Sequence, residues 1–277
     1  MPVSNAITPS KLARLTGTPA APPLFDLRDQ TAGPDARLIP GALPRPGRIA
    51  DWGPQVRSAS AILVCEDGGA ASQGAAAWLR ALGVEAEILE GGFAAWEAAG
   101  LPLVPARLLP PRDALGRTLW VTRARPKVDR IACPWLIRRF VDPAALFLFV
   151  PAGEVPAVAE AYDAAPFDLQ SDGVFWSHRG ERCTFDTMIE ELGLSGFEGL
   201  AHLAPIVRGA DTDRLDLAPE AAGLLALSLG LSRLHASDTD QLEAGMPLYD
   251  ALYRWCRDAR GETHDWVSHT PRQSERA

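Results

Sequence analysis

The chain has 277 residues, of which 47% are hydrophobic and 22% are charged, a composition typical of globular proteins and too apolar for a disordered chain. This length accommodates about two domains. The formal net charge of −8 argues against nucleic acid as the main partner, because phosphate binding requires a basic surface. No apolar run is long enough to span a membrane, and the N-terminus lacks the apolar core of a secretory signal. We therefore expect a soluble cytoplasmic protein.

The first part of the chain predicts an N-terminal arm followed by a buried strand. We expect the arm over residues 1–22, with a helix near Thr8–Leu15 in which Thr8 is the cap and Pro9 takes the first helical position. Residues Leu24–Leu27 are apolar enough for a core strand. The proline- and glycine-rich segment Leu43–Pro54 predicts an irregular loop.

Around Cys65, a short apolar strand, Ile62–Val64, runs directly into a glycine-containing loop. A helix is expected over Ser72–Leu82, and a second strand over Val84–Leu89. Because Cys65 lies just before a helix start, free backbone N–H groups and the helix dipole favour its thiolate form. Nucleophilic sulfur chemistry is the natural use of such a thiol.

Four motifs in this region resemble a single-domain rhodanese, a family of sulfurtransferases. They are Asp26-Leu-Arg28, Ile39-Pro40-Gly41-Ala42, Cys65 before Gly68-Gly69, and Glu90-Gly91-Gly92-Phe93 with Trp96 and Gly100-Leu101-Pro102. The resemblance covers about residues 20–104 and implies an α/β domain, over 23–104, with a parallel sheet flanked by helices. It implies Cys65 as the catalytic persulfide nucleophile, with Asp26 and Arg28 supporting the active site. A surface ion pair is the alternative for Arg28.

The loop after Cys65 departs from the rhodanese pattern Cys-x-x-Gly-x-Arg-Ser. If Ser72 matches the family serine, Ala71 takes the place of the arginine that holds anionic substrate. The expected substrate-binding loop is then Gly68, Gly69, Ala70 and Ala71. Glu66 and Asp67 would repel thiosulfate and oppose ionisation of the thiol. Two interpretations remain open: slow persulfide chemistry with a less anionic donor, or a binding module that has lost turnover.

After a proline-rich linker, residues 105–117, the second half resembles another family. The segments 123–143, 178–186, 205–213 and 247–256 resemble, in order, the C-terminal domain of the ChrB chromate-resistance proteins. The likeness covers about Leu119–Asp258 and implies a role in chromate response. We expect an α+β, mainly helical domain over 118–260 and a flexible tail over 261–277. Fuller members carry a different N-terminal region tied to DNA binding, so that activity is not transferred to this chain.

The segment around Pro134 suggests an anion site. If Pro134 takes the first position of a helix, Cys133 is its N-cap, which favours the thiolate. Four cations lie close by and could hold an oxyanion such as chromate, sulfate or phosphate by paired hydrogen bonds. The alternative is a solvated basic segment. The four are Arg123, Arg125, Lys127 and Arg130.

A second cluster of reactive side chains surrounds a predicted two-residue turn at Gly180-Glu181. This turn would pair Arg179 with Arg182 and place His178 opposite Cys183. Such a pair suits a soft or borderline metal, a redox thiol activated by histidine, or a plain hydrogen bond. Further ligands would be needed for a metal. The predicted metal ligands are Asp129, Cys133, His178, Cys183 and Asp211.

Four more helices are expected in the second domain. They cover Phe185–Leu192 with Thr184 as cap, Glu198–Arg208, Pro219–Leu231 and Pro247–Asp258. Ser237-Asp238-Thr239-Asp240 is expected to cap a helix rather than to bind calcium.

Together these patterns predict a thiol protein of the chromate or oxyanion response with a small anionic substrate, able to transfer sulfur through Cys65. The alternative is a non-catalytic sensor of a metal or oxyanion. The motifs require no cofactor, and a metal ion in the second domain is the one candidate. Neither nucleic acid nor membrane is an expected partner, and the oligomeric state is not predicted.

Overall fold

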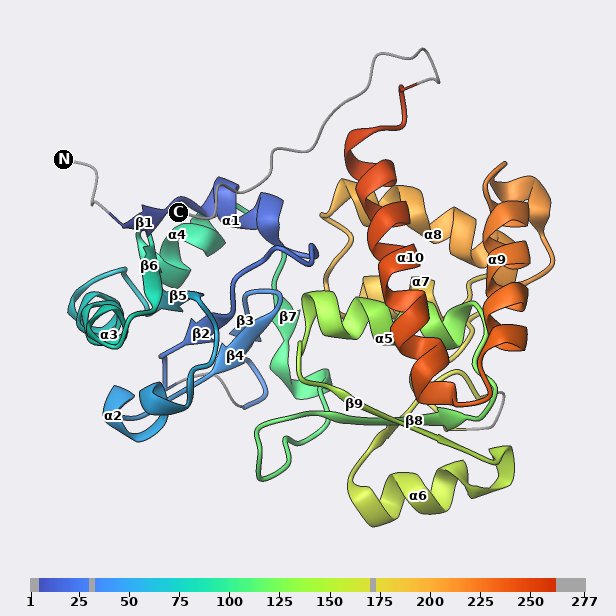
Figure 1. The fold of residues 1–277 in the computed structure, drawn as a ribbon, viewed down its shortest axis with the longest axis horizontal. Helices are drawn as coiled ribbons and strands as arrows, with labels where there is room; N and C mark the ends of the chain where they lie inside the picture. Colours follow the sequence, from blue (N-terminus) through green and yellow to red (C-terminus); the bar gives the residue numbers. More distant parts are fainter. Residues whose placement is uncertain (1–4, 30–32, 170–172, 263–277) are drawn as a thin grey trace.

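A computed structural model describes residues 5–29, 33–169 and 173–262. Its first domain is built on a parallel five-stranded sheet in the order β1-β6-β5-β2-β4. The strands are β1 Ala6–Ile7, β2 Leu24–Asp26, β4 Ala42–Pro44, β5 Ser60–Val64 and β6 Glu85–Leu89. The helices are α1 Pro9–Leu15, α2 Ile49–Trp52, α3 Ala70–Ala81 and α4 Gly92–Ala98, with a 3-10 turn, η1 Gly53–Gln55. This is the α/β architecture that the sequence predicted (Figure 1).

Both faces of this sheet are covered, which explains why β5 is apolar at successive positions. Ile62 and Val64 pack in one apolar cluster with α1 and α4, whereas Ala61 and Leu63 pack in another with α3. Strands buried on both faces read as continuous apolar runs. As a result, Cys65 emerges at the carboxyl end of a central strand.

The N-terminal predictions match the structure at the helix cap and extend the sheet at its edge. Thr8 caps α1, since its hydroxyl accepts a hydrogen bond from the N–H of Lys11 at 3.3 Å, and Pro9 is the first helical residue. Strand β1 pairs in parallel with β6, so part of the expected N-terminal arm belongs to the sheet. The helix after Cys65 begins at Ala70, two residues before the predicted start.

The second domain has a parallel three-stranded sheet, in the order β10-β8-β9, beneath a layer of helices. Its strands are β8 Leu119–Arg123, β9 Leu146–Val150 and β10 Ala165–Pro166. The helices are α5 Asp129–Phe140, α6 Val155–Tyr162, α7 Thr184–Glu191, α8 Glu198–Asp211, α9 Ala221–Leu234 and α10 Asp238–Asp258. The remaining short elements come from the whole chain: β3 Arg37–Leu38, β7 Val104–Pro105, η2 Ala106–Leu108, η3 Ala152–Glu154 and η4 Leu215–Leu217. Helix α6 covers one face of the sheet and α5 lies on the other, so the α+β, mainly helical prediction is confirmed (Figure 1).

Two helix starts were predicted wrongly, for the same reason. Pro134 and Pro247 lie inside α5 and α10 and do not begin them. Proline lacks the N–H that a helix interior uses, but burial of a long apolar face can offset that loss. Helix α10 begins at Asp238 instead, where the hydroxyl of Ser237 accepts from the N–H of Asp240 at 3.2 Å. The capping role expected for that acidic segment is therefore confirmed.

The two domains contact one another directly. The N–H of Gly41 donates to the carbonyl of Phe140 at 2.7 Å. The linker contacts the second domain as well, since Arg112 lies 3.1 Å from the buried carboxylate of Asp142. A Cβ on Gly17 would lie 2.1 Å from the Phe140 ring, so only glycine fits there.

Among the described residues, no helix is both long and apolar enough to cross a bilayer. The predicted flexible tail falls largely in 263–277, outside the described residues.

Candidate metal centre and the Cys65 loop

Asp129 is the first residue of α5 and lies fully buried beside the start of α7. Its Oδ2 atom accepts hydrogen bonds from the N–H groups of Thr184 at 2.6 Å and of Phe185 at 3.3 Å. The carboxylate thereby satisfies N–H groups that have no partner within α7. The N–H of Asp129 donates to Oδ1 of Asp211 at 3.4 Å, which connects α5 to the last residue of α8.

Asp168 lies two residues beyond β10, and its two oxygens have different surroundings. Oδ2 lies 3.2 Å from Nε of Arg130 and 3.5 Å from Nη2 of Arg123. Oδ1 accepts a hydrogen bond from the hydroxyl of Thr184 at 3.1 Å. One oxygen is therefore paired with cations, and the other is directed toward the start of α7.

His178 brings these carboxylates together. Its Nε2 atom lies 3.2 Å from Oδ2 of Asp211 and 3.4 Å from Oδ1 of Asp168. The same nitrogen is 3.6 Å from Oδ2 of Asp129. The ligand atoms of Asp129, Asp168 and His178 all lie within 4.8 Å of one another, a spacing that could surround one metal ion. The imidazole is 27% exposed, so the cluster is open to solvent on the histidine side.

The fold places this cluster where parallel sheets commonly bind ligands. From β8 the chain passes through α5 to β9 on one side, and from β9 through α6 to β10 on the other. Between β8 and β10 the direction of the connections therefore reverses. Ligands of open parallel sheets bind beyond the carboxyl ends of the strands at such a switch point. Asp129 and Asp168 follow β8 and β10, respectively.

The charges of the cluster are strongly coupled. Burial raises the pKa of Asp129 well above its ordinary value, and the charges of Asp211 and Asp168 raise it further. Burial also acts to raise the pKa of Asp168, but the hydrogen bond with His178 and the charge of Arg130 outweigh it and leave that pKa lowered. Hydrogen bonds with Asp168 and Asp211 raise the pKa of His178 to about 10. The cluster thus holds a cation on its imidazole.

The backbone is strained next to both buried carboxylates. Val128, immediately before Asp129, has φ 37°, and Asp168 itself has φ 51°. A positive φ is unfavourable for β-branched valine in particular. Such residues persist where the surrounding structure fixes them and are concentrated at functional sites.

Of the five predicted metal ligands, the structure brings Asp129, His178 and Asp211 together. Cys183 lies next to them, because a hydrogen bond from its thiol acts to lower the pKa of Asp129. The thiol of Cys183 lies 3.3 Å from Oδ2 of Asp186, and burial raises the pKa of Cys183 and of Cys133 far above the ordinary value. Cys133 is inside α5, so the expectation of a thiolate stabilised at a helix start is wrong there.

The predicted turn beside His178 is confirmed. Arg179 and Arg182 exchange backbone hydrogen bonds at 3.0 and 3.1 Å, and Gly180 has φ 61°, as a turn with glycine at its first central position requires. This turn fixes the chain direction just after His178.

Asp168 is the member of the cluster that the sequence did not predict. It follows a strand of only two residues, Ala165–Pro166, whose pairing with β8 no local pattern indicates. The available signal was an aspartate shortly after a buried phenylalanine, Phe167, in a domain already expected to contain a sheet.

The four cations predicted to form an oxyanion cradle serve different partners. The guanidinium of Arg125 donates to backbone carbonyls at the end of α9, including His235 at 3.0 Å and Ala236 at 3.3 Å. Arg123 and Arg130 face Asp168, as described above. Lys127 is exposed. Protein groups therefore account for three of the four cations, and the cradle stays a prediction.

In the first domain, Cys65 lies at the start of a loop, and polar side chains contact its thiol. Its Sγ atom is 3.4 Å from Oδ1 of Asp67 and 3.1 Å from the hydroxyl oxygen of Ser72. The N–H of Phe93, in the first turn of α4, donates to the Cys65 carbonyl at 2.9 Å. A Cβ on Gly92 would lie 2.5 Å from that carbonyl oxygen, so the Gly91-Gly92 turn permits this close approach.

Asp67 occupies part of the loop in which a rhodanese would hold its anion. Its Oδ1 accepts from the N–H of Gly69 at 2.8 Å. This bond, followed by that from the Cys65 thiol, lowers the pKa of Asp67 below its ordinary value. Gly69 belongs to the expected substrate-binding loop, so one of its anion-binding N–H groups is already engaged by a carboxylate of the same loop.

Arg28 lies beside this loop and connects it to Asp26 and Phe93. Its Nη2 lies 2.7 Å from Oδ2 of the buried Asp26, and its guanidinium stacks 3.4 Å from the centre of the Phe93 ring. Its Nη1 is 3.9 Å from Glu66 in the loop. With only 9% of its side chain exposed, Arg28 does not form a surface ion pair.

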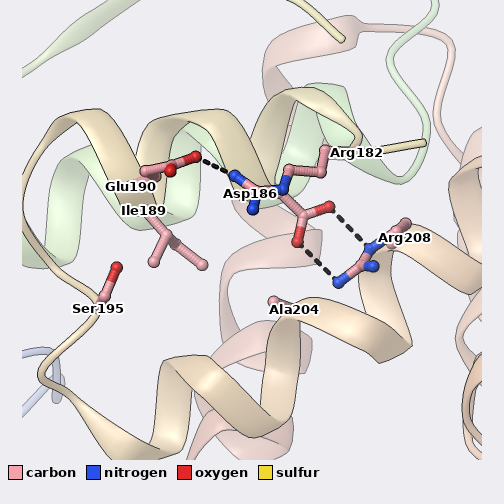
Figure 2. A pocket seen from close by; sticks show the side chains of 7 residues that line it. All are labelled: Arg182, Asp186, Ile189, Glu190, Ser195, Ala204 and Arg208. Atoms are coloured by element: carbon pink, nitrogen blue, oxygen red, sulfur yellow. Dashed lines mark hydrogen bonds and ion pairs between the residues drawn. The ribbon is translucent and has the colours of Figure 1, made fainter. Parts of the chain in front are cut away.

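A separate cavity of about 230 Å³ lies between α7 and α8 (Figure 2). Asp186 spans it and pairs with Arg208, with contacts of 3.0 and 3.1 Å, and Arg182 pairs with Glu190. The charged side chains lining this cavity are thus paired with one another. We assign no ligand to it.

Taken together, the geometry defines a two-domain protein, with an α/β domain that carries a thiol loop and a helical domain that carries a carboxylate-histidine cluster. The sequence matches family profiles in the same order: residues 8–99 match the rhodanese-like domain, and residues 120–256 match the ChrB C-terminal domain. The chain is therefore a rhodanese-like domain followed by a ChrB C-terminal domain.

Individual relatives match only part of the chain. Protein ChrB of Cupriavidus metallidurans is 36% identical over 134 residues, which are 48% of this chain and 39% of that protein. A rhodanese-related protein from Thermoplasma volcanium is 22% identical, with a TM-score of 0.30 over 36% of this chain and 98% of its own. A thiosulfate sulfurtransferase from Pseudomonas aeruginosa is 30% identical, with a TM-score of 0.30 over 37% of this chain and 19% of its own.

Proposed function

We propose that this protein acts in the chromate response and that its second domain binds a divalent cation at Asp129, Asp168, His178 and Asp211. The role in chromate response is supported by membership of the ChrB C-terminal family. The cation site is supported by one observation: a single imidazole nitrogen lies within 3.6 Å of three carboxylates in a largely buried place.

The electrostatics of the cluster favour a cation there. Arg123 and Arg130 offset the charge of Asp168, which leaves Asp129 and Asp211 to share one imidazole. Buried charges require pairing or a metal, because desolvation disfavours them strongly. A divalent ion would displace the proton that His178 otherwise holds and would supply two positive charges in place of one.

The donor set indicates the class of metal. Three carboxylate oxygens and one imidazole nitrogen suit Mn²⁺, Fe²⁺ or Zn²⁺, whereas thiophilic ions prefer sulfur ligands. The thiols of Cys133 and Cys183 are buried and protonated, and they stay outside this donor set. We therefore expect a hard or borderline ion rather than a soft one.

Titration of the chelator-treated full chain with Mn²⁺, followed by electron paramagnetic resonance of the free ion, tests this site. We expect one tight site, and weakening by at least about 10–100-fold in Asp211→Asn and in His178→Gln, the loss typical even for partners outside the ligand shell. Asp213→Asn and His202→Gln are matched controls, because both residues lie in or next to α8 but outside the cluster.

Circular dichroism would show that each variant is folded. Absence of stoichiometric binding for Mn²⁺, Fe²⁺ and Zn²⁺ alike would refute the site. Equal affinity in wild type and in both ligand variants would place the ion elsewhere and refute the assignment as well.

A second candidate function is carriage of a persulfide by Cys65. The observation that favours it is that the thiol stays at the strand end, with the Ser72 hydroxyl at 3.1 Å. The Asp67 carboxylate disfavours thiosulfate and leaves a less anionic donor. The Cys65 thiolate would attack the outer sulfur of a small persulfide, whose own thiolate leaves. Mass spectrometry should then show one added sulfur atom, which Cys65→Ala abolishes; an unmodified wild-type chain would exclude this role.

A further inference from the structure

Helix α9 has an unusual distribution of polar and apolar residues. Its buried positions are Ala221, Leu224, Ser228 and Ser232, so half of these buried positions are serine. Of its eight exposed positions, all but Arg233 are uncharged. Leu227 is 54% exposed and Leu234 is 78% exposed. A helix at the surface of a soluble protein normally shows the reverse pattern.

Two glycines on the exposed face make no close packing contact with the described residues. A Cβ added to Gly223 or Gly230 would meet no atom within 4 Å, and neither residue has a positive φ. Glycine inside a helix is destabilising by about 0.5–1 kcal/mol relative to alanine. Neither packing nor backbone conformation in the described structure therefore accounts for these glycines.

Two of the three exposed leucines of α9 alternate with the two glycines at heptad spacing. Gly223, Leu227, Gly230 and Leu234 follow one another at intervals of four, three and four residues, which places them along one side of the helix. Helix α9 lies at the outer edge of the helical layer (Figure 1), and all four positions are exposed. The result is a row of leucine projections and glycine gaps, which we call the α9 stripe.

The α9 stripe is complementary to itself. Leu227 and Gly230 are symmetric about the midpoint between Ser228 and Leu229, and Gly223 and Leu234 are symmetric about the same point. If a second α9 crosses antiparallel about a two-fold axis there, each leucine faces a glycine of the other copy. Two-fold interfaces require this kind of self-complementarity.

We propose that α9 is a homodimerisation surface on which a second copy of this chain docks antiparallel, with Leu227 and Leu234 inserted at Gly230 and Gly223 of the partner. The charge distribution fits this occupant. The two-fold axis keeps the two Arg233 side chains about 14 Å apart along the helix, at 1.5 Å per residue. A helix that binds anionic membranes would carry several basic residues, and the exposed positions of α9 include one.

The size of the stripe sets the expected strength. A 14-residue helix is about 21 Å long, so the contact is at the small end of specific interfaces. We expect a dissociation constant on the order of 10–100 µM.

Sedimentation velocity of the full chain, under reducing conditions and from low micromolar to submillimolar concentration, tests the proposal. We expect a reversible monomer–dimer equilibrium that Gly230→Leu weakens by at least about tenfold, because the added side chain fills the gap for Leu227. The same substitution should leave the thermal unfolding temperature unchanged or higher, since the position is open and leucine favours helix. A merely structural role for Gly230 would lower that temperature.

Matched controls lie in the first domain. Gly74 in α3 also has open space around its Cβ position, and Leu82 is 53% exposed. Gly74→Leu and Leu82→Glu should leave the equilibrium unchanged, whereas Leu234→Glu should abolish the dimer. A monomer at every concentration, or a dimer insensitive to Gly230→Leu and Leu234→Glu, would refute the proposal. A chain that stays monomeric and sediments with anionic phospholipid vesicles would refute it too, because the occupant is then a membrane.

Discussion

The Cys65 loop and the cluster around Asp129 both place carboxylates beside a reactive side chain, but they balance the charge in opposite ways. In the loop, the Asp67 carboxylate accepts hydrogen bonds from Gly69 and the Cys65 thiol, and its pKa is lowered. At Asp129, burial and two neighbouring carboxylates raise the pKa well above its ordinary value. The first carboxylate is satisfied by its own loop, whereas the second is crowded by like charges.

This difference separates a closed site from an open one. A carboxylate that occupies the anion-binding N–H groups of its own loop leaves little room for an anionic substrate. Buried carboxylates that crowd one another create a place for an added cation. The rhodanese-like domain thus retains the thiol of its family in a loop whose own carboxylate binds the loop N–H, and the ChrB C-terminal domain presents the better candidate ligand site.

The largest expected effect is on thiol reactivity. Cys133 and Cys183 are fully buried with raised pKa values, whereas Cys65 is 6% exposed between polar partners. We expect iodoacetamide to label Cys65 in the native state and the other two only through unfolding, at least about 1,000-fold more slowly. Peptide mapping over time measures the three rates. Comparable labelling of Cys183 and Cys65 would contradict the contrast between the two sites.

The second effect is on stability. Asp129→Ala leaves the N–H groups of Thr184 and Phe185 without an acceptor and should lower the unfolding free energy by about 2–3 kcal/mol. Asp129→Asn keeps one acceptor oxygen and should lose about half of that amount. Urea unfolding in the presence of chelator measures both variants. If Asp129→Ala were as stable as wild type, relief of carboxylate repulsion would outweigh capping of α7.

The sequence predicted the architecture well where local patterns repeat known motifs. Some structures are determined by residues that are neighbours in the sequence, so a short segment is enough to predict them. Examples are the strand that ends at Cys65 and the turns at Glu90-Gly91-Gly92 and Gly180-Glu181. The positions of two prolines were predicted wrongly because they depend on contacts between residues far apart in the sequence. Pro134 and Pro247 are favourable at a helix start, but packing across the domain keeps them inside α5 and α10.

The candidate metal centre was predictable only in part, because its members come from separate segments. Asp129, His178 and Asp211 lie in segments that resemble the ChrB C-terminal domain. The position of Asp168 depends instead on the pairing of β10 with β8. Cys183 was expected opposite His178 on one face of the turn. Its capping of α7 instead directs the thiol to Asp186, a choice that no residue spacing reveals.

The third prediction asks whether the closed loop can be opened. Asp67→Ala frees the N–H of Gly69 and removes a charge 3.4 Å from the Cys65 sulfur. Combined with Ala71→Arg, which restores the cation of the rhodanese pattern, it should raise thiosulfate-dependent thiocyanate formation by about tenfold or more. Cys65→Ala in the same background is the control. No gain in the double variant would mean that other features of the loop exclude the anion.

The smallest effect concerns Cys256, a buried thiol whose raised pKa does not depend on the Asp129 cluster. Burial is the main cause that raises its pKa from 9.0 to about 11. Because the unfolded chain then loses this proton first, stability is constant below about pH 9 and falls as the pH rises toward 11. Between about pH 8 and pH 10, we expect the unfolding free energy of Cys256→Ala to fall by about 1 kcal/mol less than that of wild type. Urea unfolding at each pH measures this difference. An identical alkaline loss in both proteins would assign the pH dependence to other groups, among them the thiols beside Asp129.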